Sequence, residues 1–577
     1  MINTGEFILV IAAFIYFAAA MAGILLNKKP FARKLTNILL ITSVILITLD
    51  MLLLVFYQLH HDFRFVYVYE HTSFDLAPAY LVSALWAGQE GSFLLWAVIN
   101  SWIGFALWRA LNKHNFQNKL IFTCFAVINI CIIMMALLSQ PFKLMTYVPA
   151  EGLGLNLALQ DPWMAVHPPF VFIGYSSMAV LFSLGLGTDP KIEKYWEMTI
   201  LRKWALQGWL FLGMGIFTGS LWAYRALGWG GYWSWDPIEN AALIPWLLLT
   251  GVAHGGHTTS KAGSRVKYML PFVMAAFGTF LARSGILKDK SLHAYTGSSL
   301  SIPLFIFLAI LVLAILYFGL STVKRNEINR QYGVISILSI LNVILYAFAA
   351  LVFLGTIFPL ISGTAVTTVF FNSSALFFSI AFTILFIAEC YTGFKEAFFK
   401  VLFVSAVITA VICLSMKFTS LIWLLVLWIL LMPLVLWVLN TTRMKPTLHF
   451  KKIKNPFAAV AHAGVIFLIL GAVTSTAFSE QRAVLITAGS STCLGYGAQI
   501  DSSRLNLKRS TIIHTIGSDI ILSPAGNGSS STKQAVYYTT RPLILLFWIG
   551  GVLIILGILG ALLTPYGATQ FTFHFLK

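Results

Sequence analysis

The sequence predicts an all-α polytopic integral membrane protein with about fifteen transmembrane helices and a small β-containing insert outside the membrane. Hydrophobic residues make up 59% of the 577 residues and charged residues only 10%, a composition that a soluble protein of this length does not carry. Apolar runs long enough to span a membrane recur along the chain. One longer polar stretch, residues 479–541, alternates apolar and polar residues as a strand does.

Apolar runs of roughly 17 to 25 residues define the expected transmembrane helices. They cover residues 6–26, 37–59, 92–108, 120–139, 168–188, 205–222, 240–257, 268–286, 300–322, 335–361, 370–393, 400–416, 420–440, 457–478 and 543–563. The first run is too long for a cleaved signal and lacks its basic leading segment, so we expect a retained helix. The chain is therefore divided into a helical core over residues 1–478, the insert over 479–541, and a last helix with its tail over 542–577.

The net charge of +18 indicates orientation in a membrane and not binding to nucleic acid, because Lys and Arg lie in short loops between apolar runs. Loops that follow the odd-numbered spans hold 24 Lys and Arg residues, and the six short loops of the other set hold seven. Cytoplasmic loops carry the excess of positive charge, so the first set is expected in the cytoplasm. The N-terminus and the insert are then expected outside.

Residues 221–240, which fall on the outer side, hold tryptophan rings separated by glycines. The members of this group are Trp222, Trp229, Trp233 and Trp235, with Gly228, Gly230 and Gly231 between them. Glycine lets the backbone approach whatever lies on the rings, so the stretch is typical of a platform for a planar apolar ligand. Asp236-Pro237 is expected to end the loop, and Glu239-Asn240 to cap the next helix.

An aromatic belt at the membrane surface is the plainer interpretation of these rings. Belt residues normally sit on regular helices, whereas these rings alternate with glycine. The interleaved glycines therefore favour the ligand platform.

Two histidines lie well inside the expected spans. His254 is seven residues before Lys261, and His462 is eight residues after Lys454, so each lies roughly 10 to 12 Å from the cytoplasmic edge. Either each ring is satisfied by a backbone carbonyl, or the two bind one metal. Two imidazoles between apolar helices suit haem iron better than zinc, which would take four ligands. His257 is nearer the water and is the weaker candidate.

A second pair of histidines is expected at the outer surface. His167 precedes Pro168-Pro169, whose rings fix the chain as it enters its span, and His293 lies in the short segment after the eighth span. Other outer histidines are His60, His61, His71 and His514. By position alone, any one of these is a solvated surface residue. The rigid Pro-Pro setting favours His167, and the short returning loop favours His293.

Three further features bear on function. Asp50 lies mid-span, which makes it either a functional acid or one paired with a polar neighbour. Trp86 to Trp96 is expected to form an outer re-entrant turn that opens the third span, with Glu90 and Ser92 as caps. None of the five cysteines forms a Cys-x-x-Cys pair, so we expect the chain itself to do no dithiol chemistry.

These motifs, in their order along the chain, resemble the haem-handling superfamily with a tryptophan-rich (WWD) signature, and within it the CcmF, CycK and NrfE branch of cytochrome c-type biogenesis proteins. The similar segments are Trp86–Trp96, with Gln89 where the family commonly has His; Asn156–Pro162; His167–Tyr175; Gly228–Ala241, the signature itself; Gly278–Leu287 followed by His293-Ala294; and Ala461–Val465.

The resemblance implies a haem lyase and a role for each matching residue. His254 and His462 would ligate a resident haem b, while His167 and His293 would be the axial pair for haem arriving on the platform of Trp222, Trp229, Trp233, Trp235 and Asp236. Gly228, Gly230 and Gly231 would let that haem approach. The family receives haem from the chaperone CcmE and joins its vinyl groups to a Cys-x-x-Cys-His apocytochrome c, with CcmH and CcmI as thiol-handling partners. The resident haem is thought to reduce the incoming iron.

The sequence departs from the family at two places. Arg225 stands where Glu is usual, and it either pairs with a haem propionate or serves the surface. The insert is short for the family, which leaves the choice of docking partner open. A haem or solute transporter and a lyase dedicated to a special cytochrome, such as a nitrite reductase, are the alternatives. The expected location is a bacterial inner membrane with the active face periplasmic, or a mitochondrial inner membrane.

Overall fold

The computed structural model describes most of the chain. The described residues are 3–25, 30–113, 119–187, 195–226, 231–255, 261–287, 291, 295, 300–325, 336–391, 398–415, 421–442, 456–487, 491–493, 499–501, 511–515, 517–524 and 533–563. They form two compact units. The first comprises Met1–Gly219, Trp235–Ala253 and His257–Gly333, and the second comprises Ser220–Ser234, His254–Gly256 and Val334–Lys577.

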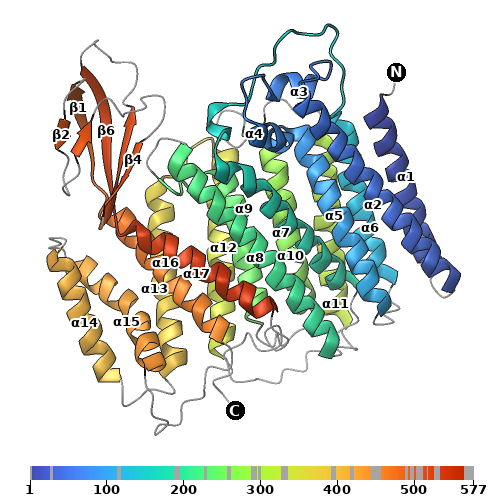
Figure 1. The fold of residues 1–577 in the computed structure, drawn as a ribbon. Coiled ribbons are helices and arrows are strands. Elements are labelled where there is room, and N and C mark those ends of the chain that lie inside the picture. The colour runs from blue at the N-terminus through green and yellow to red at the C-terminus, as the bar shows by residue number, and fades with distance from the viewer. Residues whose placement is uncertain are drawn as a thin grey trace. The chain divides into compact units, whose positions relative to one another are not determined.

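A long helix lies over each of the fifteen expected spans (Figure 1). These helices are α1 (Thr4–Leu25), α2 (Pro30–Leu59), α5 (Gln89–Lys113), α6 (Lys119–Ser139), α7 (Pro162–Gly187), α8 (Tyr195–Ala226), α9 (Pro237–Ala253), α10 (Lys261–Arg283), α11 (Ser301–Arg325), α12 (Ile337–Ser362), α13 (Thr368–Tyr391), α14 (Phe398–Ser415), α15 (Leu421–Thr442), α16 (Pro456–Ala477) and α17 (Ile544–Leu563). Within the described residues, ten helices are long and apolar enough to cross a membrane. The predicted polytopic helical fold is therefore confirmed.

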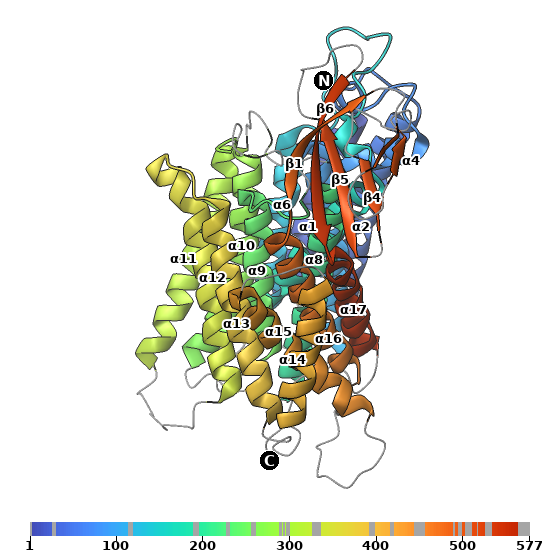
Figure 2. The ribbon, with the colours of Figure 1, turned by 90° about the vertical axis from the view of Figure 1, so that its left-hand side faces the viewer.

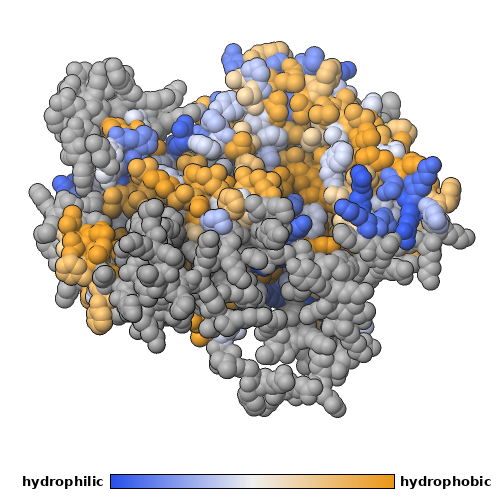
Figure 3. Space-filling view, turned by 60° about the horizontal axis from the view of Figure 1, so that its bottom comes forward, coloured by the Kyte–Doolittle hydropathy of each residue, from blue (hydrophilic) through white to orange (hydrophobic). Residues whose placement is uncertain are grey.

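Large apolar side chains cover much of the outward surface of these helices, as the orange areas of Figure 3 illustrate for one face. Phe14 on α1 is 71% exposed, Leu313 on α11 is 64% exposed, and Leu563 on α17 is 76% exposed. Contiguous exposed apolar surface of this kind is costly in water and favourable against lipid chains. The surface agrees with a multi-pass membrane protein.

The first unit buries polar groups between its helices and satisfies several of them locally. Asn100 on α5 donates to the side-chain oxygen of Asn129 on α6 at 2.8 Å, and Asn129 in turn donates to Ser101 Oγ at 3.0 Å. Asp50 on α2 is fully buried, and neither carboxylate oxygen has a hydrogen-bond partner in the part of the chain that the structure describes. Of the two alternatives for Asp50, the one in which it pairs with a polar neighbour therefore has no support among the described residues.

Short elements lie between the long helices of the first unit. They are α3 (Val66–His71), α4 (Pro78–Ser83), the 3-10 turn η1 (Ala84–Trp86) and the 3-10 turn η2 (Leu157–Leu159). The Tyr67 hydroxyl bonds the Ala84 and Leu85 carbonyls at 2.9 and 2.7 Å and lies 3.0 Å from the Gly88 amide. These contacts fix the turn that opens α5.

Close packing of two helices organises the second unit. Gly464 on α16 faces Gly550 on α17, and a Cβ built on Gly464 would lie 2.7 Å from the Gly550 carbonyl oxygen and 2.6 Å from the Ile554 nitrogen. Further along, a Cβ on Gly557 would lie 2.6 Å from the Ala461 nitrogen. Small residues let membrane helices approach to backbone contact. The glycines thus set the position of the α16 turn that carries His462.

The insert forms antiparallel β-structure, as the alternating sequence predicted. A four-stranded sheet has the order β1 (Gln481–Thr487), β6 (Lys533–Pro542), β5 (Ser518–Pro524) and β4 (Thr511–His514), seen side by side in Figure 2. A separate pair joins β2 (Ser491–Cys493) to β3 (Gln499–Asp501). Strand β6 leads directly into α17, so the sheet is attached to the glycine-packed helix pair.

Candidate functional site

The tryptophan-rich stretch is a break between two helices. Helix α8 ends at Ala226 and α9 begins at Pro237, with Gly231 to Asp236 described between them. Gly228, Trp229 and Gly230 lie outside the described residues. Trp235 has a φ of 60°, a left-handed conformation that is uncommon for a residue with a side chain. Such outliers cluster at functional sites.

Asp236 caps α9. Its Oδ1 accepts from the Ile238 amide at 2.8 Å, and Glu239 Oε2 accepts from the Asp236 amide at 3.2 Å. This reciprocal arrangement, with Pro237 at the first helical position, is a capping box. Asp236 itself is therefore the cap, while Glu239 completes the box and Asn240 donates to the Trp235 carbonyl at 3.1 Å.

The described tryptophans occupy different surroundings. Trp222 is 4% exposed near the end of α8, while Trp233 is half-buried against a cluster formed by Tyr224, Tyr232, Ile521, Ile544 and Phe547. A Cβ on Gly231 would meet its nearest atom, Arg541 Nη2, at 3.6 Å, an ordinary contact. Packing within the described residues therefore does not require a glycine at position 231.

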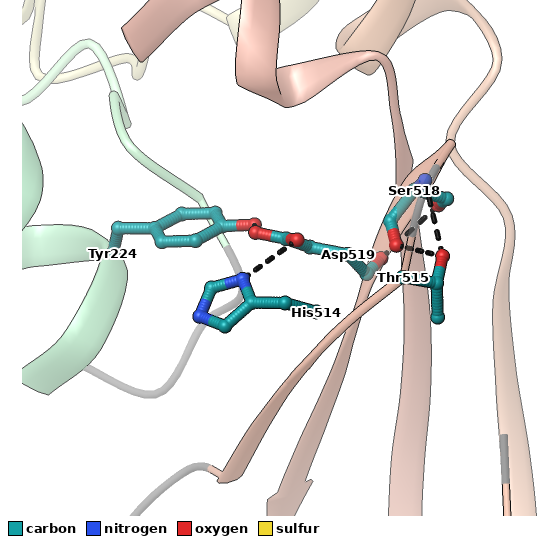
Figure 4. Close-up of polar contacts among 5 residues, drawn as sticks. All are labelled: Tyr224, His514, Thr515, Ser518 and Asp519. Atoms are coloured by element: carbon teal, nitrogen blue, oxygen red, sulfur yellow. Dashed lines mark hydrogen bonds and ion pairs between the residues drawn. The ribbon is translucent and has the colours of Figure 1, made fainter.

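The sheet of the insert is bonded to the tryptophan-rich stretch through one buried carboxylate (Figure 4). The Tyr224 hydroxyl donates to Asp519 Oδ2 at 2.9 Å, and His514 Nδ1 lies 2.8 Å from Asp519 Oδ1. His514 and Asp519 are cross-strand partners at the end of the β4–β5 hairpin. The His514 side chain is 76% exposed and that of Asp519 only 9%. Tyr224 therefore holds the hairpin against the last turn of α8.

The structure brings His254 and His462 together. His254 directly follows α9, His462 lies on α16, and their ring centroids are 5.9 Å apart with an interplanar angle of 89°. His462 Nδ1 lies 2.7 Å from the Ala458 carbonyl oxygen, and the ring stacks on Phe386 of α13 at 5.9 Å. A carbonyl oxygen can only accept, so Nδ1 is the donor and Nε2 is left to face other groups.

The outer histidines are described only in part. His167 lies inside α7, where its Nδ1 is 2.7 Å from the Gly215 carbonyl oxygen of α8. A Cβ on Gly219 would lie 2.9 Å from the same ring. His293 and His257 lie outside the described residues. His71, expected to be solvated, is instead half-buried, stacks on Tyr67 at 4.3 Å, and has its pKa lowered by burial.

Arg225 is exposed in the last turn of α8, where a cation is favourable next to the terminal carbonyls. Glu90 lies in the first turn of α5, a favourable place for an acid, but Ser92 is not a cap. The Ser92 hydroxyl donates to the Gln89 carbonyl at 2.8 Å and accepts from Arg283.

The sequence analysis missed Tyr224, Asp519 and Arg283. Arg283 and Tyr224 lie within segments that the sequence analysis singled out, Gly278–Leu287 and residues 221–240, whereas Asp519 had no such signal.

Comparison with known proteins agrees with the motifs. The family model described as Cytochrome C assembly protein matches residues 86–287, which include α5 to α10. The NrfE cytochrome c-type biogenesis protein of Haemophilus influenzae is 30% identical over 471 residues, covering 75% of this chain and 72% of the relative. The Escherichia coli CcmF protein is 31% identical over 347 residues, covering 56% of this chain and 53% of the relative.

A solved structure of the cytochrome c haem lyase CcmF superposes with a TM-score of 0.74 at 20% identity, covering 98% of this chain and 97% of that one. At this identity the likeness concerns the fold. Fold and sequence together therefore assign this chain to the class of membrane proteins that assemble cytochrome c. The chain belongs to the CcmF and NrfE family of cytochrome c-type biogenesis proteins.

Proposed function

We propose that this protein is the haem lyase component of a cytochrome c maturation system in a bacterial inner membrane. It receives haem from the chaperone CcmE on the periplasmic side and promotes attachment of that haem to the two thiols of a Cys-x-x-Cys-His apocytochrome. The observation that carries the proposal is the pair His254 and His462, one directly after α9 and one on α16, whose rings are in edge-to-face contact.

Both rings suit a haem iron by their chemistry. Imidazole nitrogen is a common ligand of haem iron. His254 and His462, whose ring centroids are 5.9 Å apart, are the residues that would hold the group. The Ala458 carbonyl holds His462 Nδ1–H, as outer-shell acceptors commonly do for ligating histidines. No group of three His, Cys, Asp or Glu side chains that would suit zinc occurs in the described residues.

When bound to His254 and His462, a haem b would supply an electron to the iron of the arriving haem substrate. The chain's own contribution is to fix the two rings in an apolar setting. His462 is held by its carbonyl bond and by the Phe386 face. Phe386 also excludes water from that side of the ring.

On the outer side, the protein acts mainly by positioning its substrates. The family resemblance assigns His167 and His293 to the iron of the haem substrate, and Trp222, Trp229, Trp233, Trp235 and Asp236 to the platform for that haem. The Gly215 carbonyl holds His167 Nδ1–H and leaves Nε2 for iron.

Attachment forms a C–S bond between each thiol and a vinyl carbon, and the thiol proton ends on the other vinyl carbon. No oxidant is consumed in that step. The thiols come from the apocytochrome, which CcmH and CcmI present, in agreement with a chain that has no Cys-x-x-Cys pair.

The test is covalent haem attachment to a reporter apocytochrome c in cells that lack their own lyase. His167→Ala should abolish attachment, because one iron ligand of the haem substrate is lost, while the resident haem spectrum persists. His60→Ala is the control, since His60 is exposed and Nδ1 is held by the Phe56 carbonyl at 2.9 Å. Normal attachment in His167→Ala would refute the outer site. Failure of the unaltered protein to support attachment would favour a transporter.

A further inference from the structure

Arg283, the last residue of α10, is a buried cation surrounded by aromatic rings. Its guanidinium carbon lies 5.1 Å from the ring centroid of Phe93, 5.7 Å from that of Phe172 and 5.4 Å from that of Tyr295. Its Nη2 donates to Ser92 Oγ at 2.9 Å. Only 9% of the residue is exposed.

The charge of Arg283 is not matched by an anion in the described part of the chain. None of the ion pairs found there involves this residue, and its Nε is buried without a hydrogen-bond partner. Removing a guanidinium from water is costly unless it is paired. The three rings and the terminal carbonyls of α10 offset part of that cost. The surroundings still lack a negative charge, which a ligand would supply.

Arg283 lies where several motif segments meet. Phe93 and Ser92 begin α5, while Phe172 lies on α7 five residues after His167. Tyr295 follows His293 by two residues, and its hydroxyl donates to the Ala87 carbonyl at 3.4 Å. The cation is therefore in contact with α7, the helix that carries His167, and with Tyr295, which lies two positions after His293 in the sequence.

We propose that Arg283 is a carboxylate-binding residue of the outer site and holds a propionate of the haem substrate. The planar guanidinium pairs with a carboxylate through two parallel hydrogen bonds, which fixes direction as well as charge. A fixed propionate edge orients the opposite part of the ring, where the vinyl groups must face the thiols. This inference rests on the proposed function and adds the residue that sets the rotation of the ring.

The experiment compares binding of haem with binding of haem dimethyl ester, whose propionates carry no charge. Absorption titrations of the purified protein are corrected with those of His167→Ala, so that only the outer site is measured. The unaltered protein should bind haem about tenfold more tightly than the ester, as a charge-assisted hydrogen bond implies. Arg283→Met should bind both ligands equally, and Arg283→Lys should keep part of the preference.

Arg225→Met is the matched control, because Arg225 is exposed in the last turn of α8 and was the sequence-based candidate for a propionate partner. It should keep the tenfold preference. Equal binding of haem and ester by the unaltered protein would overturn the inference, and that comparison does not depend on any variant of Arg283. Loss of the preference in Arg225→Met, or its persistence in Arg283→Met, would overturn it as well. Absence of any haem binding at the outer site would instead refute the proposed function.

Discussion

Individual side chains in this protein are held in place by a small number of directional bonds. His462 and His167 each donate Nδ1–H to a backbone carbonyl oxygen, at 2.7 Å in both cases. Each ring therefore has its second nitrogen available in a fixed orientation. Asp519 uses both carboxylate oxygens, one with Tyr224 and one with His514. Such bonds can be removed singly, which makes the residue scale the easiest to test.

Changing Tyr224 to Phe should loosen the insert. The change removes the hydroxyl that donates to Asp519 and leaves a buried carboxylate oxygen without that donor, a loss of about 1 to 3 kcal/mol. Amide exchange measured by mass spectrometry should become faster in β4 and β5. Tyr537→Phe is the control, because Tyr537 lies on β6 in the same sheet and is 42% exposed. Unchanged exchange in Tyr224→Phe would show that the hydroxyl does not anchor the hairpin.

At the scale of secondary-structure elements, function depends on where helices end and how closely they approach. The capping box of Asp236 and Glu239 sets the start of α9, the helix that ends next to His254. The glycines of α16 and α17 set the turn that carries His462. His254 is thus positioned by the cap at the other end of α9, and His462 by the contact between α16 and α17.

Substitutions of Asp236 should separate its capping role from a catalytic one. Asn is as good a cap as Asp, so Asp236→Asn should leave thermal stability unchanged, whereas Asp236→Ala should cost about 0.5 to 2 kcal/mol. If the carboxylate charge also serves haem attachment, Asp236→Asn will lose attachment while remaining stable. Wild-type attachment by a stable Asp236→Asn protein would assign Asp236 to capping alone.

Changing Gly557 to Ala should separate α17 from α16. The added Cβ would lie 2.6 Å from the Ala461 nitrogen, so the helices must move apart, at a cost of about 1 to 3 kcal/mol. Because Ala461 precedes His462, the variant should also bind less resident haem. Gly517→Ala is the control, since a Cβ there meets nothing within 4 Å. Equal melting temperatures for the two variants would contradict the close packing.

For the molecule as a whole, the charge pattern predicts one orientation. Protease sites placed in the 261–267 segment should be protected from the outside, and sites in the 479–541 insert should be cut. The reason is that Lys261, Arg265 and Lys267, at the start of α10, belong to the positively charged set of segments, which is expected to stay cytoplasmic. Proteolysis of intact spheroplasts measures this directly. Cleavage at 261–267 alone would reverse the topology.

The helices could be predicted from sequence because a membrane span needs a long apolar run, and each run became one helix. The alternation in the insert likewise predicted strands. The equal depth of His254 and His462 left a shared site and separate carbonyl bonds both open, and the structure shows the rings close together and His462 bonded to the Ala458 carbonyl. The Tyr224–Asp519 bond could not be predicted, because it joins residues 295 positions apart and neither has a local pattern. The aromatic rings around Arg283 could not be predicted either, because Phe93 of α5, Phe172 of α7 and Tyr295 meet only through tertiary contacts.

The central claim is that His254 and His462 bind one haem. The most direct measurement is the reduced-minus-oxidised visible spectrum of the purified protein beside those of His254→Ala, His462→Ala and the His60→Ala control. His254→Ala and His462→Ala should each lose the b-type signal, because each removes one of the two imidazoles that would hold the haem, and the control should retain it. A full b-type spectrum in either intramembrane variant, or no haem in the well-folded unaltered protein, would contradict the account.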